Sequence, residues 1–224
     1  MPIPKTKIIE KETSKDKAYR QIRDWIIDGT LEPNEKLAET SLAQAVGISR
    51  TPVREALLKL NEVGFVILAT GKMTQVAPLD VSEAANLFLT MSSLEGIAAA
   101  QAVGQLKAAD LDRLTKRQAA YEKAVAGGHW QQIFKADRAF HEVILQVADN
   151  PYVTQFSNQL YGHILRVETH YLAQQSGQSV LDARHHDVLT AMKNGVALDA
   201  KAAIESDWLA VMDQVQSVAT TVSE

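Results

Sequence analysis

One stretch constrains the fold more than any other part of the chain: residues 42–64, with the sequence LAQAVGISRTPVREALLKLNEVG. It predicts a short helix that ends at Gly47 and a longer helix whose first turn contains Pro52. Either Ser49 or Thr51 is expected to cap the second helix. Apolar residues recur at helical spacing in both segments, which predicts that one face of each helix is buried: Leu42, Ala43, Val46, Val53, Ala56, Leu57 and Leu60.

The exposed face of the second helix carries side chains suited to DNA. Arg50 and Arg54 lie four residues apart, so they share that face with the adjacent Thr51. Arginine can donate two hydrogen bonds to O6 and N7 of guanine, and threonine can contact a phosphate or a thymine methyl group. At the start of the second of two helices, these residues indicate a recognition helix for the major groove of DNA.

The segments on either side fit a winged helix-turn-helix. Residues 18–28 predict an amphipathic helix that packs under the helix-turn-helix, and residues 1–15 predict a flexible tail. Residues 65–79, FVILATGKMTQVAPL, predict a hairpin with Gly71 and Lys72 at its tip, where a cation can contact the DNA backbone or the minor groove. A hairpin that only closes the small core is the alternative.

The distribution of charge is compatible with DNA binding by the N-terminal part. The 224-residue chain has a formal net charge of −4, but residues 1–77 hold 12 Lys and Arg against 10 Asp and Glu, and the remainder holds 11 against 17. Because this excess is small, a basic surface must be local, and we expect it to comprise Arg50, Arg54, Lys59 and Lys72.

Composition also bounds the setting of the protein. The chain has no cysteine, which excludes disulfides and thiolate metal sites. No uncharged apolar run approaches the ~18 residues of a membrane span, and the N-terminus lacks the apolar centre of a secretory signal. We therefore expect a cytoplasmic protein without membrane contact.

Residues 77–80, APLD, interrupt the hairpin pattern and mark the expected domain boundary. The sequence predicts a mainly α fold, with a DNA-binding domain over residues 16–78 and an all-helical domain over residues 79–224. The second domain is expected to be an antiparallel bundle of about six helices with an interior pocket, over roughly residues 81–104, 108–126, 130–148, 151–174, 178–194 and 197–221.

Three of these predicted helices place acidic or imidazole groups on their apolar faces. Asp137 and His141 continue the stripe of the third helix, His185 falls on the stripe of the fifth, and Asp207 falls on that of the sixth. Burying such groups is costly unless they are compensated. One divalent cation held by all four would compensate them, and the donor set suits Zn²⁺, Mn²⁺, Ni²⁺ or Fe²⁺. Alternatively, the groups satisfy one another by hydrogen bonds, or Asp207 lies at a solvated end of the bundle.

The segment ISRTPVREALLKLNEVGFV resembles the helix-turn-helix of the GntR family of bacterial transcription regulators, and the remainder resembles the FadR-like subfamily. The resemblance implies an all-helical C-terminal (FCD) domain that often binds metal. The metal-binding subgroup uses a DxxxH pair, which DRAFH matches at Asp137 and His141, and a later histidine, which HHDVLTAM matches at His185.

The same resemblance places Asp207 where the last ligand is usually histidine, a departure that shifts the expected preference toward Mn²⁺ or Mg²⁺. Alternatively, the site has three ligands or has lost the metal, and His163 is the substitute ligand or an effector contact. The effector implied by the family is an organic acid. Many relatives hold it with an arginine on the first bundle helix, where this chain has Met91 and Ser92, so the metal or Arg166 is expected to anchor it instead.

One further departure concerns DNA: some relatives have an arginine in the helix before the turn, where this chain has Thr40. The function predicted is a bacterial, ligand-responsive transcription regulator, a repressor associated with the nucleoid. Two copies are expected to bind a palindromic operator, because one helix reads too few bases for genomic specificity. The alternatives are a metal-dependent enzyme, for which we find no general base or nucleophile motif, and a constitutive DNA-binding protein without an effector.

Overall fold

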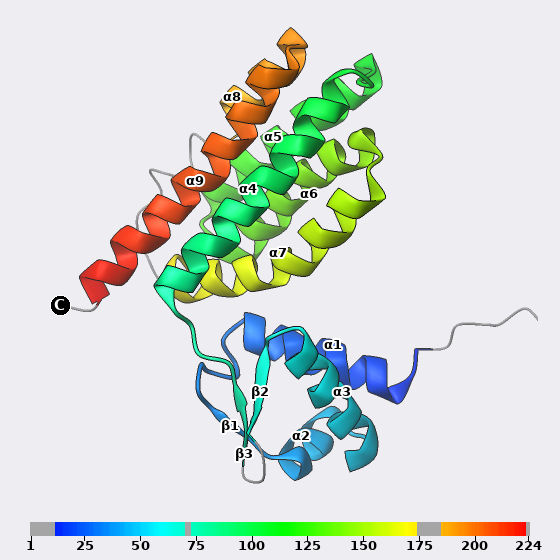
Figure 1. Ribbon diagram of the computed structural model, residues 1–224, viewed down its shortest axis with the longest axis vertical. Helices are drawn as coiled ribbons and strands as arrows, with labels where there is room; N and C mark the ends of the chain where they lie inside the picture. The colour runs from blue at the N-terminus through cyan, green and yellow to red at the C-terminus, as the bar shows by residue number, and fades with distance from the viewer. Residues whose placement is uncertain (1–11, 70–72, 174–184, 223–224) are drawn as a thin grey trace, which may run out of the picture. The chain divides into compact units, whose positions relative to one another are not determined.

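The computed structural model describes residues 12–69, 73–173 and 185–222, and Figure 1 shows a mainly α-helical chain. The chain divides into two compact units, residues 1–78 and 79–224. The main hydrophobic cores of the two units share no residue, which is the usual property of separate domains.

Three helices of the first unit enclose its core: α1 (Ser14–Ile27), α2 (Glu39–Val46) and α3 (Arg50–Glu62). The hydroxyl of Thr13 accepts a hydrogen bond from the backbone of Asp16, so α1 begins two residues inside the segment predicted as a tail. The helix α2 ends at Gly47, whose φ of 74° lies in the left-handed region that favours glycine. All the apolar positions predicted to face the core of the helix-turn-helix are buried. The helix-turn-helix prediction is therefore confirmed.

Within the described residues, the sheet of the first unit has three antiparallel strands in the order β1-β3-β2: β1 (Lys36–Leu37), β2 (Val66–Ala69) and β3 (Met73–Val76). Val66 lies opposite Val76 in the β2–β3 pair, which confirms the predicted hairpin. Lys36 and Leu37 pair with Gln75 and Thr74 and form the third strand, which was not predicted from the sequence. A strand of two residues is too short to show an alternating sequence pattern, so only its pairing with β3 defines it.

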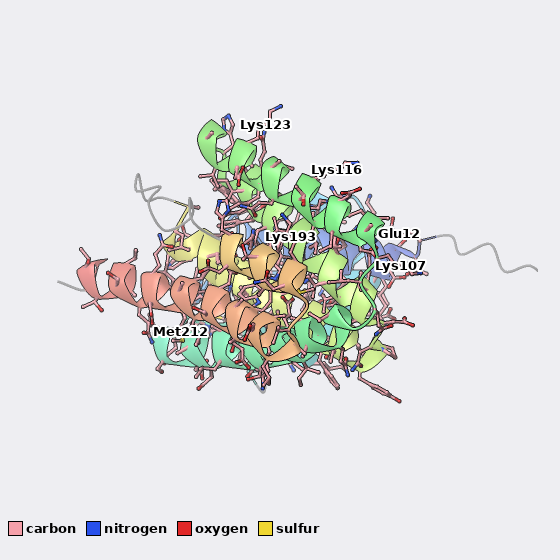
Figure 2. All side chains as sticks on the ribbon, turned by 90° about the horizontal axis from the view of Figure 1, so that it is seen from above. Glu12, Lys107, Lys116, Lys123, Lys193 and Met212 are labelled. Atoms are coloured by element: carbon pink, nitrogen blue, oxygen red, sulfur yellow. The ribbon has the colours of Figure 1, made fainter. Side chains whose placement is uncertain are left out.

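The second unit contains six helices in the part of it that is described: α4 (Val81–Val103), α5 (Ala108–Gly127), α6 (Trp130–Ala148), α7 (Pro151–Tyr171), α8 (His186–Asn194) and α9 (Ala197–Val222). The long helices α4 and α9 lie side by side, and α4 also packs against α6 and α7. The helix α5 turns its charged face outward, as Lys116 and Lys123 show (Figure 2), and buries Leu114, Gln118 and Tyr121.

The beginning of α8 differs from the prediction. The sequence predicts a helix over residues 178–194 with His185 on its apolar stripe, whereas α8 begins at His186. His185 precedes the helix with a φ of 69°, a left-handed conformation that is uncommon outside glycine. Residues 174–184, which include the predicted start of this helix at residue 178, lie outside the described part of the chain.

Among residues 12–69, 73–173 and 185–222, no helix is both long enough and apolar enough to cross a membrane.

Candidate metal centre and DNA-binding face

The predicted DNA-reading side chains gather at the start of α3. Arg50, Thr51 and Arg54 are all exposed there, and the earlier Thr40 on α2 is exposed as well. Ser49 is the N-cap residue by backbone conformation, although its side chain makes no capping hydrogen bond within the described residues. The alternative cap, Thr51, is already inside the helix.

The basic side chains predicted for this face make different contacts. The Nη2 atom of Arg50 lies 3.3 Å from Oε2 of Glu39, in an exposed ion pair that contributes little to stability. The ammonium of Lys59 lies 4.4 Å from the centre of the Tyr19 ring, so this predicted basic residue packs on α1. The two residues predicted at the wing tip, Gly71 and Lys72, lie outside the described part of the chain.

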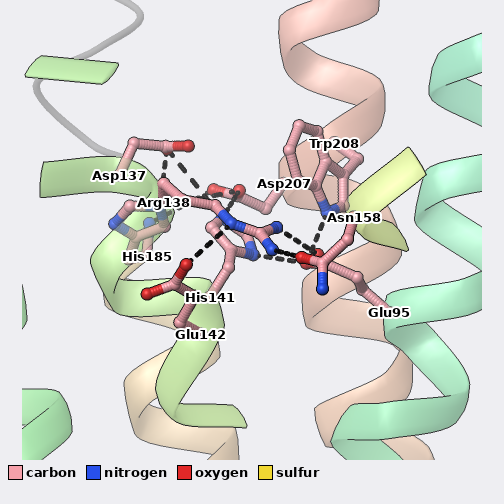
Figure 3. A network of polar contacts seen from close by, with 9 residues as sticks. All are labelled: Glu95, Asp137, Arg138, His141, Glu142, Asn158, His185, Asp207 and Trp208. Atoms are coloured by element: carbon pink, nitrogen blue, oxygen red, sulfur yellow. Dashed lines mark hydrogen bonds and ion pairs between the residues drawn. The ribbon is translucent and has the colours of Figure 1, made fainter. Parts of the chain in front are cut away.

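In the helical unit, four predicted ligands converge at one buried point (Figure 3). Asp137 and His141 are one turn apart on α6 and are each 1% exposed. His185 comes from the residue before α8, and Asp207 comes from α9 and is 9% exposed. Asp207 is therefore buried, and the alternative that it lies at a solvated end of the bundle is wrong.

The distances within this group are close to the separation expected between two ligand atoms of one ion. Nε2 of His185 lies 3.2 Å from Oδ1 of Asp137, and Nε2 of His141 lies 3.9 Å from the same oxygen. Oδ2 of Asp207 lies 3.6 Å from Nε2 of His141 and 3.9 Å from Nε2 of His185. Two ligands each about 2.1 Å from a tetrahedral ion are separated by roughly 3.4 Å. Asp137, His141 and His185 form the tightest set, with ligand atoms all within 4.8 Å of one another.

The unusual backbone at His185 explains how its side chain reaches this point. Its ring stacks on Phe140, with centroids 4.2 Å apart and an angle of 9° between the planes. Its backbone N–H donates to Oδ1 of Asp207 at 3.2 Å. A left-handed residue before a helix costs free energy, of order 1–3 kcal/mol, and such strain is retained where the surroundings fix it. Here the aromatic stacking and the bond to Asp207 fix it.

The outer nitrogens of both imidazoles have partners that the sequence analysis missed. Nδ1 of His141 lies 2.6 Å from Oε2 of Glu95 on α4, and Nδ1 of His185 lies 3.1 Å from Oε1 of Gln118 on α5. The helical spacing carried a signal for both, because Glu95 and Gln118 fall on buried faces of their helices.

The electrostatics of the group favour a positive charge at its centre. With a proton on Nδ1, a neutral imidazole turns the lone pair of Nε2 toward the carboxylate oxygens, where a cation or a second proton is required. Nε2 of His141 is buried and makes no hydrogen bond within the described residues. Burial lowers the pKa of His141, but the nearby carboxylates, Glu95 foremost, outweigh it and raise that pKa above the ordinary 6.5. The residues present therefore fit a divalent cation.

The predicted effector contacts come from two helices, α4 and α7. Met91 is fully buried in the hydrophobic core, and the hydroxyl of Ser92 donates to the backbone carbonyl of Leu89. Arg166 is buried on α7, which lowers its pKa to about 10 and still leaves it a cation at neutral pH. His163, the suggested substitute ligand, is half-buried on the same helix and is not a member of the tight set.

Comparison with known proteins places this geometry in context. Residues 14–76 match the family described as bacterial regulatory proteins, gntR family, and residues 86–208 match the FCD domain. The transcriptional regulator McbR of Escherichia coli is 29% identical over 168 residues, which cover 74% of this chain and 76% of that protein. The solved structure described as E. coli McbR/YncC has a TM-score of 0.75 at 25% identity and covers 91% of this chain and 99% of that one.

Two further relatives are more distant or match over a shorter segment. The transcriptional repressor RspR of Escherichia coli is 23% identical over 175 residues, 78% of this chain and 77% of that protein. The uncharacterized regulator YdhC of Bacillus subtilis is 27% identical over 133 residues, 59% of this chain and of that protein.

The fold and the two sites define a helix-turn-helix transcription regulator whose helical domain holds a candidate metal site. Its relatives are described as regulators and not as enzymes. The chain belongs to the gntR family of bacterial regulatory proteins and carries the FCD domain as its C-terminal part.

Proposed function

We propose that this regulator is a repressor whose affinity for its operator is set by a small carboxylate bound at a metal ion in the FCD domain. One observation carries the proposal: two buried Nε2 atoms face the oxygens of Asp137 and Asp207 at 3.2–3.9 Å. Repression is inferred from RspR, which is described as a repressor.

Asp137, His141 and His185 would hold the ion, with Asp207 as the fourth ligand. When bound, a divalent metal supplies positive charge that attracts a carboxylate. Two aspartates and two histidines balance oxygen and nitrogen donors, a set that Mn²⁺, Zn²⁺, Ni²⁺ and Fe²⁺ all accept. Arg166 is a buried cation of the same domain, and we propose that it contributes to binding the effector.

DNA recognition would rest on Arg50 and Arg54 at the start of α3. Both are exposed, and an arginine in the major groove can distinguish guanine by two hydrogen bonds. Thr51, Ser49 and Thr40 on α2 are exposed, and we propose that they contact phosphates. We propose that two copies of the chain bind a palindromic site. The effector would act by binding more tightly to dimers with one particular distance between their two DNA-binding domains.

Metal analysis together with operator binding tests the proposal. Purified protein is expected to contain about one divalent ion per chain, and His141→Ala and His185→Ala should each lose it. A panel of mono-, di- and tricarboxylates is then titrated against a protein–operator complex, with the His141→Ala variant as control. An effector that changes operator affinity only in the metal-loaded wild type supports the proposal. Metal-free wild-type protein that is already fully responsive would exclude the metal from it.

A further inference from the structure

The hydrogen-bond partners of the two histidines allow a step beyond the ligand set, one that rests on the proposed metal site. We infer that Glu95 and Gln118 are positioning residues: each holds a proton on Nδ1 of its histidine, so that both rings present Nε2 to the cation. The two partners differ in charge, and the inference therefore also ranks His141 and His185 as ligands.

The hydrogen bonds of Gln118 fix which nitrogen of His185 carries the proton. The amide nitrogen of Gln118 donates to Oε1 of Glu122 at 2.9 Å, and a carboxylate can only accept there. The amide oxygen of Gln118 consequently faces Nδ1 of His185, at 3.1 Å, and an oxygen acceptor requires a donor. Nδ1 of His185 therefore carries a proton, and Nε2 is the nitrogen available to a metal.

The partner of His141 is a buried carboxylate. Oε2 of Glu95 lies 2.6 Å from Nδ1 of His141 and also accepts from Nε1 of Trp208 at 3.0 Å (Figure 3). Nη1 of Arg138 lies 3.8 Å from Oε1 of the same group, which offsets its negative charge. Glu95 thus remains an acceptor inside the bundle, where an isolated carboxylate would be too costly.

A network beyond the ligands holds this carboxylate in place. The guanidinium of Arg138 packs over the Tyr161 ring, 4.4 Å from its centre, and its Nε lies 3.2 Å from Oε1 of Glu142. Gly96, next to Glu95, allows α9 to approach, because a Cβ there would lie 3.0 Å from the Glu205 side chain. The helix that supplies Trp208 can therefore lie close against α4.

A charged acceptor has a chemical consequence that a neutral one lacks. A carboxylate that accepts from the far side of an imidazole raises the basicity of the metal-binding nitrogen and fixes the ring orientation. Glu95 is expected to do both for His141, whereas Gln118 mainly orients His185. His141 is thus expected to be the stronger metal ligand of the two histidines.

The first experiment reads the tautomers directly in metal-free protein. Long-range ¹H–¹⁵N correlation spectra of protein labelled in histidine are recorded at a pH where both rings are neutral. We expect His141 and His185 to carry the proton on Nδ1. A proton on Nε2 of His141 would overturn the inference, whether or not the protein binds metal.

The second experiment measures the affinity for Co²⁺ alone, and the visible spectrum of the bound ion, in wild type and variants. Glu95→Gln keeps an oxygen acceptor but loses the charge, so we expect about a 10-fold weaker affinity and a shifted spectrum; Glu95→Leu should lose about 100-fold. Glu83→Gln is the matched control: it removes an exposed carboxylate in the first turn of the same helix, outside this network, and should leave affinity and spectrum unchanged.

The outcomes distinguish a failure of the proposed metal site from a failure of the proposed role of Glu95. If wild type binds no Co²⁺, the metal site itself is wrong and the tautomer spectra alone decide the role of Glu95. If wild type binds and folded Glu95→Leu binds equally well, the site stands and the positioning role is wrong. Should Glu95→Leu fail to fold, as judged by circular dichroism in chelator, Glu95→Gln carries the test, and an unchanged affinity there together with an unchanged spectrum excludes the charge effect.

Discussion

At the scale of single residues, Arg54 offers the sharpest test of DNA reading. It is exposed on α3, one turn after Arg50. If its guanidinium bridges O6 and N7 of a guanine, Arg54→Ala should weaken specific binding by ~1–3 kcal/mol and relax the preference at one base pair. Electrophoretic mobility shifts with the operator and with single-base variants of it measure both effects.

Arg54→Lys is the control for charge. Lysine keeps the positive charge but cannot form the two-pronged bond in the same plane, so non-specific affinity should persist while base preference falls. If Arg54→Lys retains full discrimination, Arg54 contacts only phosphate and the base assignment is wrong.

A second residue-scale prediction follows from the raised pKa of His141. A group whose pKa is higher in the folded than in the unfolded state stabilises the fold below the unfolded pKa and loses that contribution as pH rises. In metal-free protein, stability should therefore decline as the pH increases above ~6.5, and urea unfolding in the presence of a chelator measures it. In His141→Ala this decline should be absent.

With excess Co²⁺ the dependence of stability on pH should reverse, because metal binds only the deprotonated imidazole. A metal-free wild type that gains stability over this pH range, relative to His141→Ala, would contradict the raised pKa of His141.

At the scale of secondary-structure elements, the start of α7 is set by one side chain. Oδ1 of Asn150 accepts from the backbone N–H groups of Tyr152 and Val153, each at 3.2 Å. Asn150→Ala removes both bonds, together with the exposed bond from its Nδ2 to Oε1 of Gln101, and should lower the free energy of unfolding by ~1 kcal/mol, as measured with urea. Gln159→Ala, an exposed change within the same helix, should stay within about 0.5 kcal/mol. Equal effects of the two changes would mean that the cap contributes nothing.

The elements also show how far sequence reasoning reaches. Helical spacing placed Asp137 and His141 correctly on the buried face of α6, because a regular helix repeats its faces. The same reasoning failed at His185, whose direction is set by its stacking on Phe140 and not by a helical period. The strand β1 is invisible for a related reason, since its pairing partner lies far along the chain.

The partners of the ligands lie at the limit of this reasoning. Glu95 and Gln118 sit at apolar positions of their helices, so a search for buried polar residues could have found them. What no spacing reveals is which imidazole each one meets, because these contacts join helices across the bundle. Asp137, His141 and Asp207 followed from helical spacing as candidate ligands, whereas the contacts that orient the two histidines required the fold.

At the scale of the whole molecule, the two units have separate cores, so metal should stabilise only one of them. An ion that binds the folded state alone adds ~2.7 kcal/mol at a free concentration 100 times its Kd. Differential scanning calorimetry should therefore show one transition that moves upward with Co²⁺ and one that does not. In His185→Ala both transitions should stay in place, and a shift of the two together in wild type would mean that the units unfold as one.

The proposed dimer on DNA makes the last prediction, which concerns the operator more than the protein. Two recognition helices can contact one face of a duplex only if their half-sites are separated by about one helical turn, roughly 10 base pairs, or a multiple of it. Inserting about 5 base pairs between the half-sites turns them to opposite faces of the duplex. One DNA-binding domain of the dimer must then dissociate, and affinity should fall to that for a single half-site.

An insertion of about 10 base pairs returns the half-sites to the same face but leaves them farther apart. Affinity should recover only if the two DNA-binding domains of the dimer can reach this larger distance. Mobility shifts with this spacing series, together with the mass of the complex, measure the effect. Affinity that ignores the spacing would show that a single DNA-binding domain binds alone, and the helical unit would then need a role other than joining two chains.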